Sequence, residues 1–249
     1  AGATSIGGAA YTGADSATAI GNNATSSGQG ATAIGADSSA DGTLAVGIGG
    51  QDSNGNGGAA SQQSVAIGFN SGAVGTAGTS VGGYSVAAGF LSSAFGYSAS
   101  AIGDYSLAAG LGATSMGEDS VALGDSAEAD GAFSVALGAG SVADQDNTIS
   151  IGSAGAERRL VNLAEGIDPT DAVNMRQFTA FADDVQSQLD ALVDAAVNAE
   201  YAAIDGAGDG SDTASVDTGS KGVAIGSNAE AGGDHGTAVG GDSYAAGPN

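Results

Sequence analysis

Residues 119–138 read DSVALGDSAEADGAFSVALG, in which the segment SVALG occurs twice, at 120–124 and at 134–138. Glycine stands at every seventh position from Gly68 to Gly138 and again at Gly152, and Gln145 is the one exception in that series. The same spacing is found near both ends of the chain, at Gly7, Gly21, Gly28, Gly35 and Gly42 and at Gly219, Gly226, Gly233, Gly240 and Gly247. A fixed short period of this kind indicates a repeat architecture.

Each half unit of the repeat predicts one short strand. In SVALG the side chains alternate between the two faces of an extended chain, and glycine accepts the turn conformation that ends the strand. Two half units, and therefore two strands, then form one coil of a solenoid. The period does not fit a hexapeptide helix, and the G-G-x-G-x-D pattern of the nonapeptide calcium roll is absent. The repeat therefore predicts an all-β, flat, two-sided β-roll of about 14-residue coils.

The two faces of each strand differ in the size of their side chains. Two positions before each central glycine the residue is Ala or Ser, for example Ala122 and Ala136. The residue directly before the glycine tends to alternate between large apolar and small or charged, as in Leu123 and Asp130. Because an unpaired buried carboxylate is costly, we expect the Ala/Ser row inside a thin roll and the large residues outside. The opposite arrangement, with the large residues inside, remains an alternative.

Large apolar residues that point outward form an exposed ladder on a single chain. Such a stripe needs a cover, and association with further copies of the chain provides one. The residues predicted for this interface between copies in the roll are Ile20, Ile34, Ile67, Val81, Leu123, Leu137 and Ile151. The size alternation shifts by half a unit near Phe95/Ile102 and again near Met116/Leu123, and the pattern itself gives no physical reason for these shifts.

Two Gly-rich stretches interrupt the repeat. Residues 47–63 read GIGGQDSNGNGGAASQQ, which predicts a surface loop inserted at about 48–63, either a contact loop or a solvated insertion. Residues 205–219 read DGAGDGSDTASVDTG, so we expect a flexible linker over 205–220. The solenoid pattern returns at 221–249, which predicts the start of a second β-roll.

After Gly152 the composition changes. Residues 157–178 read ERRLVNLAEGIDPTDAVNMRQF and hold three of the four basic residues. We expect these arginines to pair with nearby carboxylates on neighbouring copies, because guanidinium and carboxylate groups form strong charge-assisted hydrogen bonds. Pro169 suits a helix start, and Thr170 or Asp168 could cap the helix. The carboxylates in question are Glu157, Glu165, Asp168 and Asp171.

From Met175 onward, apolar residues recur at spacings of three and four, which predicts an amphipathic helix with a heptad seam. A helix of about four heptads with an acidic outer face does not fold alone, so the seam requires partners. The seam residues are Met175, Phe178, Ala182, Val185, Leu189, Leu192, Ala196, Ala199 and Ala203. Their pattern alone does not fix the number of chains.

Composition excludes several classes of function. The chain has 249 residues, 46 glycines, no Trp, and a net charge of −24, which argues against nucleic acid and anionic membrane surfaces as partners. It has no Cys, so no disulfide framework or thiolate metal site is expected. No apolar run reaches the length of a spanning helix, and Ala1 onward does not resemble a signal peptide. We therefore expect an internal segment or a mature piece of a longer protein.

Motifs that carry chemistry have structural explanations here. Gly78 to Gly82 matches G-x-S-x-G, but Ser80 occupies the small-residue row of the repeat. His235 is the single histidine and has no second His or Cys for a metal or a triad. Gly47, Gly49 and Gly50 lack the lysine of a phosphate loop. Acid pairs such as Glu118/Asp119 and Glu128/Asp130 are expected to be solvated, with weak Ca²⁺ binding as an open alternative. We expect no enzyme activity and no cofactor.

The SVAIG-type repeats, the segment RRLVNLAEGIDPTDAVNMRQF and the heptad helix together resemble the head, neck and stalk of YadA-type trimeric autotransporter adhesins. The resemblance implies a left-handed parallel β-roll, a homotrimeric fibre with an α-helical trimeric coiled coil, and display on the outer membrane of a Gram-negative bacterium. The implied divisions are a head at 1–153, a neck at 154–174 and a coiled-coil segment at 175–204. The implied neck residues are Arg158, Arg159, Asp171, Ala172, Val173 and Asn174.

Three functions follow as hypotheses. The first is an adhesin head that attaches to extracellular matrix, host cells, abiotic surfaces or other bacteria through many weak contacts. The second is a passive structural spacer of a surface fibre, with which the return of the repeat after Asp205 is compatible. The third, an ice-binding solenoid, is suggested by Thr4, Thr18 and Thr32, although T-x-T rows are absent.

Overall fold

The structure is a computed structural model that describes residues 2–50, 61–198, 215–216, 223–226, 228–232 and 236–246. The chain divides into two compact units, residues 1–159 and residues 160–249. His235 and the stretch 199–214 lie outside the described residues.

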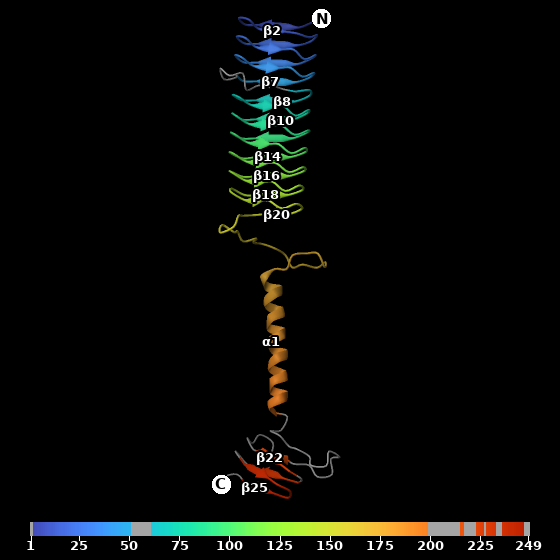
Figure 1. The fold of residues 1–249 in the computed structure, drawn as a ribbon, viewed down its shortest axis with the longest axis vertical. Helices are drawn as coiled ribbons and strands as arrows, with labels where there is room; N and C mark the ends of the chain where they lie inside the picture. Colours follow the sequence, from blue (N-terminus) through green and yellow to red (C-terminus); the bar gives the residue numbers. More distant parts are fainter. Residues whose placement is uncertain are drawn as a thin grey trace. The chain divides into compact units, whose positions relative to one another are not determined.

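The first unit is a parallel β-solenoid whose coils place short strands in two facing layers (Figure 1). One layer, the first sheet, contains 11 strands of two or three residues. These strands are β1 Thr4–Ile6, β3 Thr18–Ile20, β5 Thr32–Ile34, β7 Val46–Ile48, β8 Val65–Ile67, β10 Thr79–Val81, β12 Ser93–Phe95, β14 Leu107–Ala109, β16 Val121–Leu123, β18 Val135–Leu137 and β20 Ile149–Ser150. The predicted parallel β-roll is confirmed.

The other layer, which we call the second sheet, consists of two-residue strands in two groups of three and six. The group of three is β2 Tyr11–Thr12, β4 Thr25–Ser26 and β6 Ser39–Ala40. The group of six is β9 Gly72–Ala73, β11 Val86–Ala87, β13 Ser100–Ala101, β15 Thr114–Ser115, β17 Glu128–Ala129 and β19 Val142–Ala143. Strands of successive coils pair in register, for example Ala122 with Ala136 and Ala129 with Ala143.

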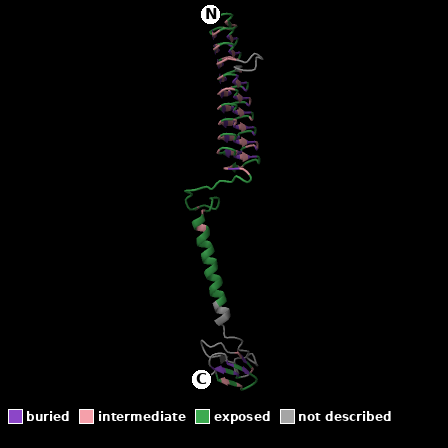
Figure 2. Cartoon of the chain, turned by 90° about the vertical axis from the view of Figure 1, so that its left-hand side faces the viewer, coloured by how far each residue is buried: buried purple, intermediate pink, exposed green. Residues whose placement is uncertain are grey.

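The core of the roll is built from alanine and serine. Ala122, Ala129 and Ala136 are fully buried, and among the described residues the buried layer between the two sheets runs from Ala17 to Ala143 (Figure 2). The expectation that the small row points inward is confirmed, and the alternative with large residues inside is wrong. The roll is thin because only methyl and hydroxymethyl groups separate the two sheets, which leaves no room for an enclosed site.

Several buried serines form hydrogen bonds through their hydroxyl groups, either with a serine on the facing side of the roll or with a nearby backbone carbonyl. Ser80 Oγ and Ser85 Oγ lie 2.7 Å apart, and Ser85 also donates to the carbonyl of Gly82 at 2.8 Å. Ser80 is therefore a core residue and not an exposed nucleophile. Ser26 Oγ and Ser106 Oγ are buried and have no hydrogen-bond partner.

The glycine period follows from the close approach of successive coils. A Cβ atom added at Gly103 would lie 2.0 Å from the carbonyl oxygen of Gly117 in the next coil, a distance that no side chain tolerates. Because the same contact recurs from coil to coil, glycine must recur with the coil. The half-unit period arises because the chain makes such a corner after each of its two strands.

The insertion predicted at 48–63 is accommodated without loss of register. Val46 pairs with Val65 and Ile48 with Ile67, so this coil is five residues longer than the coil that pairs Val121 with Val135. Residues 51–60 lie outside the described part, so the contact loop stays a prediction. Because the extra residues fall between β7 and β8, the first sheet continues through this point while the second sheet is divided into its two groups.

The second unit contains the predicted helix and a second set of solenoid strands. Helix α1 spans Met175–Asn198. Strands β21 Ser215–Val216, β23 Glu230–Gly232 and β25 Tyr244–Ala246 form one parallel sheet, and β22 Val223–Ile225 and β24 Thr237–Val239 form another. Strand β21 lies inside the range 205–220 that the sequence assigns to a linker. The return of the roll after the helix is therefore present in the structure.

Candidate functional site

The predicted ladder lies on the outer face of the first sheet. Ile20 pairs with Ile34, Val81 with Ile67, and Leu123 with Leu137. Their side chains are exposed or half-buried on this single chain, and Ile151 directly follows the last strand. The row is continuous from coil to coil. Its role as a trimer interface stays a prediction.

Part of this surface lies outside the predicted set. Ile6, Ile48 and Phe95 belong to the same row, as the pairing of Phe95 with Val81 shows. A second outward row runs along the first residue of each strand, where Leu107, Val121 and Val135 pair in sequence. Period-2 alternation in SVALG gives both rows, because the residues on either side of the inward alanine face the same way. This second outward row is aliphatic at Val46, at Val65 and from Leu107 to Ile149, and it carries Thr or Ser at its other positions, so it adds to the apolar surface only in part.

The apparent half-unit shifts in the repeat are not shifts in register. Phe95 pairs with Ala109 and Ala109 with Leu123, so the first sheet keeps one register throughout. Ile102 and Met116 instead come directly after β13 and β15 of the second sheet. They lie in the outward row of that sheet, which also contains Asp130. Each sheet has an outward row of its own, so the change in size alternation reflects which residues occupy the two rows and leaves the register of the coils unchanged.

The threonine row named for ice binding is short. Thr4, Thr18 and Thr32 do pair in register, but the next residues in that row are Val46 and Val65. The row then carries Thr79 and Ser93 and becomes aliphatic from Leu107 onward, so short hydroxyl-bearing and aliphatic stretches follow one another. This arrangement gives no extended threonine surface.

The end of the head is closed by Arg158. In successive coils a backbone amide donates to a carbonyl of the preceding coil, as the amide of Gly140 does to Asp125 at 2.8 Å. The next acceptor in this series is Ala139, and it receives the guanidinium Nη2 of Arg158 instead. Nη1 of Arg158 donates to the carbonyl of Ile151 at 2.8 Å and to Ser141 Oγ at 2.9 Å. The guanidinium of Arg158 therefore takes the place of the backbone amide that a further coil would offer to Ala139.

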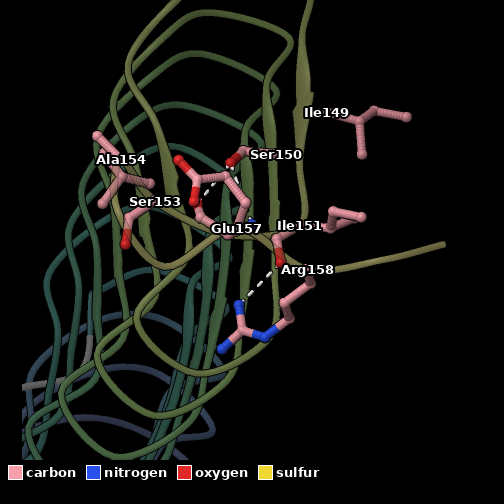
Figure 3. A pocket seen from close by; sticks show the side chains of 9 residues that line it. Ile149, Ser150, Ile151, Ser153, Ala154, Glu157 and Arg158 are labelled. Carbon is pink, nitrogen blue, oxygen red and sulfur yellow. Dashed lines mark hydrogen bonds between the residues drawn. The ribbon is translucent and has the colours of Figure 1, made fainter.

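A hollow of about 370 Å³ lies beside this cap (Figure 3). Its walls include Ile149, Ser150, Glu157 and Arg158, and the side chains of Ile149 and Ile151 are directed away from Ser150. The backbone amide of Gly155 donates to Glu157 Oε1 at 2.9 Å, and this hydrogen bond holds the pKa of Glu157 below its ordinary value. The carboxylate is thus used to fix the turn that returns the chain to the cap.

Arginine pairing differs from the prediction. Arg158 binds carbonyl and hydroxyl oxygens and not a carboxylate. Arg176 Nε lies 2.9 Å from Glu165 Oε1 of the same chain. Arg159 is exposed. Arg176 therefore pairs with one of the predicted carboxylates within its own chain, and pairing between copies stays a prediction.

The predicted neck residues of the second unit surround the start of α1. Asp171 Oδ2 accepts from the amides of Ile167 at 3.0 Å and Asp168 at 3.1 Å, and these bonds lower the pKa of Asp171. Ala172 and Val173 are exposed. The hollow that borders them is lined by Leu160, Leu163, Val173, Asn174, Met175 and Phe178.

Asn174 is the N-cap of the helix. Its Oδ1 accepts from the amide of Gln177 at 3.0 Å, and Gln177 Oε1 accepts from the amide of Asn174 at 3.3 Å, which is a reciprocal capping box. Caps at Thr170 or Asp168 are therefore wrong, since those residues form a turn before the helix. The spacing Asn174-x-x-Gln177 is the signal that could have located the cap.

Gln177 also ties the preceding loop to the helix, a role that the sequence pattern did not indicate. Its Oε1 accepts from the amide of Gly166 at 2.9 Å, and its Nε2 donates to the carbonyl of Gly166 at 2.9 Å. Asn174 Nδ2 donates to the carbonyl of Leu163 at 3.1 Å. Two side chains at the start of the helix thus hold the loop at two points.

The heptad seam is exposed on the single chain. Met175, Phe178, Val185, Leu189 and Leu192 lie on α1 with little cover. Phe181 and Val193, which flank the seam, are exposed as well and widen the apolar stripe. Ala199 and Ala203 lie outside the described residues. An apolar stripe of this width on an isolated helix is unstable in water without partners.

Within the described parts of the chain, no group of three or more His, Cys, Asp or Glu side chains is arranged to hold a metal ion. Across the same residues, no helix combines the length and apolar character needed to cross a membrane.

Comparison with known proteins gives a consistent result. The profile "YadA head domain repeat" matches residues 26–51, 87–113, 117–141, 131–154 and 218–249, and "Coiled stalk of trimeric autotransporter adhesin" matches residues 159–201. The crystal structure of the collagen-binding domain of the Yersinia adhesin YadA is similar, with 27% identity and a TM-score of 0.51. The match covers 74% of this chain and 98% of that one. No curated protein sequence matches significantly.

Proposed function

The chain belongs to the trimeric autotransporter adhesins, and from that premise we propose that it is a non-enzymatic attachment module that works as a homotrimer. The family is displayed at the cell surface and anchored in the outer membrane, and its fold serves binding rather than catalysis. The observation that carries the proposal is the continuous apolar outer face of the first sheet, which a single chain leaves exposed.

Two further copies of the chain are the proposed cover for this face. In the head, the interface comprises Ile20, Ile34, Ile67, Val81, Leu123, Leu137 and Ile151, with the aliphatic stretch Leu107, Val121 and Val135 of the parallel row. In the helix, it comprises the seam at Met175, Phe178, Val185, Leu189 and Leu192. Burial of apolar area contributes roughly 25 cal/mol per Å², so a surface repeated over 11 strands stabilises a trimer strongly.

The neck residues are proposed to join head and stalk in each copy. Arg158 closes the head, and Asp171, Asn174 and Gln177 fix the loop that leads into the helix. The apolar hollow beside Val173 is then available to the other copies. Arg159, Ala172 and Val173, all exposed on the single chain, are placed to contact them.

We propose an extracellular matrix protein as the attachment target, with host cells, abiotic surfaces and other bacteria as further candidates. The support is the likeness to a domain described as collagen-binding, over nearly the whole of that domain. A repeated lateral surface on three copies multiplies weak contacts into firm attachment. The spacer hypothesis draws on the return of the roll at β21–β25, and it predicts no binding by the chain itself.

Sedimentation equilibrium over a range of concentrations tests the assembly. The chain is expected to be a trimer, and Leu123→Asp with Leu137→Asp to give a smaller species, because six carboxylates would meet in the interface. Glu128→Ala, on the second sheet, is the control and leaves the trimer intact. A folded monomer from the unmodified chain would overturn the proposal. Surface plasmon resonance on immobilised collagen and fibronectin then separates an adhesin from a spacer.

A further inference from the structure

The second sheet carries an apolar island that the first-sheet ladder does not include. The residue after each of its strands points outward, and in the group of six strands this row reads Val74, Ala88, Ile102, Met116, Asp130 and Asp144. Ile102 is 48% exposed and Met116 is 43% exposed. They lie in adjacent coils, because Ala101 pairs with Ser115 directly before them. The row is thus apolar from Val74 to Met116 and acidic at Asp130 and Asp144.

The adjoining corner of the same coils extends the island with aromatic and aliphatic side chains. Phe90, Leu91 and Tyr105 are 42%, 47% and 49% exposed. The rings of Phe90 and Tyr105 meet edge to face, with centroids 5.6 Å apart and an interplanar angle of 89°. We call Phe90, Leu91, Ile102, Tyr105 and Met116 together the apolar island.

Two of these side chains are held at a conformational cost. Leu91 has a φ of 54° and Tyr105 a φ of 59°, in the left-handed region that disfavours residues with a Cβ by roughly 1–2 kcal/mol. Equivalent corner positions in other coils hold Gly30 and Asn147, which tolerate this conformation better. Leu91 and Tyr105 each leave about half of their surface exposed, and the packing of Tyr105 on Phe90 offsets part of this strain.

The charge around the island is of one sign. Asp104, Glu118 and Asp119 are exposed on the same corner, and the sequence has no Lys or Arg before Arg158. Asp104 Oδ1 accepts from the amide of Phe90 at 2.8 Å, which fixes this carboxylate beside the aromatic pair. A second copy of the chain would bring the same negative charges, so like-charge repulsion opposes self-association here.

From this arrangement we propose that the apolar island is a docking surface for a partner protein segment in which Lys or Arg alternates with apolar side chains. Its apolar residues pack on Ile102, Met116 and Leu91. Its cations face the carboxylates of Asp104 and Glu118 and the ring of Tyr105, where charge complementarity and cation–π attraction act together. This inference rests on the proposed function, because covering the first sheet in a trimer leaves the opposite sheet accessible.

Fluorescence anisotropy with a labelled peptide that alternates Arg and Leu tests the proposal on the full chain. Two companion peptides replace Arg by Glu or Leu by Ser. The variants are Leu91→Asn and Tyr105→Asn, which remove the side chain but accept a positive φ, as Asn147 does. Leu44→Asn is the matched control, because Leu44 is 59% exposed with a φ of 60° at an equivalent corner outside the island.

We expect the Arg–Leu peptide to bind, and each island variant to lower its affinity by about fivefold or more. Leu44→Asn should change it less than about twofold. Equal binding of the Glu peptide, equal binding of the Ser peptide, or an equal loss in Leu44→Asn overturns the docking surface. Sedimentation of the same samples keeps the two ideas apart. A monomeric parent chain contradicts the trimer, whereas dissociation caused only by the island variants makes the island a subunit contact and overturns the docking of a partner.

Discussion

The guanidinium of Arg158 donates to the carbonyl of Ala139, at the place where the next coil would supply a backbone amide. The side chain also approaches Gly138, where an added Cβ would lie 3.3 Å from Nη1, so arginine occupies the space of absent backbone. The end of a solenoid exposes a row of unpaired acceptors, and an end without donors invites fraying or unwanted pairing.

Replacement of Arg158 therefore tests the cap. Arg158→Ala is expected to destabilise the head by about 1–3 kcal/mol, since three oxygen acceptors lose a charged donor. Arg158→Lys restores only part of this, because an ammonium group lacks the planar fork. Arg159→Ala is the control. Thermal unfolding gives the stability, and hydrogen exchange is expected to show loss of protection first in β18 to β20. Equal effects of Arg158→Ala and Arg159→Ala contradict the assignment.

Glycine spacing gives a sharper contrast. Gly103→Ala is expected to destabilise the roll by at least about 3 kcal/mol, because its Cβ would meet the carbonyl of Gly117 and backbone cannot move aside. Gly72→Ala, in β9, meets nothing within 4 Å and should stabilise the roll by up to about 1 kcal/mol through the unfolded state. Chemical denaturation of the two variants measures the difference. Similar values for both would show that coil contact does not set the period.

The serine core offers two substitutions with opposite signs. Ser26 Oγ has no partner, so Ser26→Ala is expected to be neutral or stabilising by about 1 kcal/mol. Ser85→Ala should destabilise by about 1–2 kcal/mol, because it leaves Ser80 Oγ buried without its hydrogen bond. Urea unfolding of both variants at one temperature provides the measurement. A destabilising Ser26→Ala would indicate a hydrogen bond to a bound water.

Gln177 is expected to contribute more than a surface glutamine to the start of α1. Gln177→Ala removes the capping box and both bonds to Gly166, so the first helical turn should lose about 1–2 kcal/mol of local stability. Gln186→Ala is the control, since the Nε2 of Gln186 bonds to Asp190 one turn away on the exposed helix. Amide exchange at Phe178 reports the local effect. Equal amide exchange at Phe178 in the two variants would contradict this role of Gln177.

Asp171 gives the neck loop a dependence on pH. The amides of Ile167 and Asp168 lower the pKa of Asp171, so its folded value lies below the unfolded value near 3.9. Its contribution is therefore present above the unfolded pKa and is lost as the pH falls through the folded pKa. The Ile167 and Asp168 amide resonances should titrate with a midpoint below about 3.9. Asp171→Asn should abolish this titration, and a midpoint at or above about 3.9 in the parent chain would refute it.

Sequence pattern alone predicted the roll and its interior. Ala122 and Ala136 recur on one face, and Asp130 lies on the other, where burial of its unpaired carboxylate would be costly. The sequence pattern did not predict the contacts that close the end of the solenoid, because these contacts depend on which carbonyl groups the last coil leaves unpaired. Nothing in the letters RR shows that Arg158 meets carbonyl groups of the last coil while Arg159 does not. The helix cap was readable at Asn174 and Gln177, but Pro169 and Thr170 gave a competing local signal. The change in size alternation at Ile102 leaves the register unchanged, because Phe95 and Ile102 belong to the outward rows of different sheets.

Each coil pairs only with the coils before and after it, and this has a consequence for how the number of repeats can change during evolution. A duplication or deletion of one repeat unit alters the length by a single strand spacing, about 4.8 Å, and leaves each lateral row continuous. The register kept from Val46 to Val65 shows that one coil can even hold five extra residues. The length of a head can therefore evolve by recombination between near-identical repeats, while the proposed interface rows stay continuous.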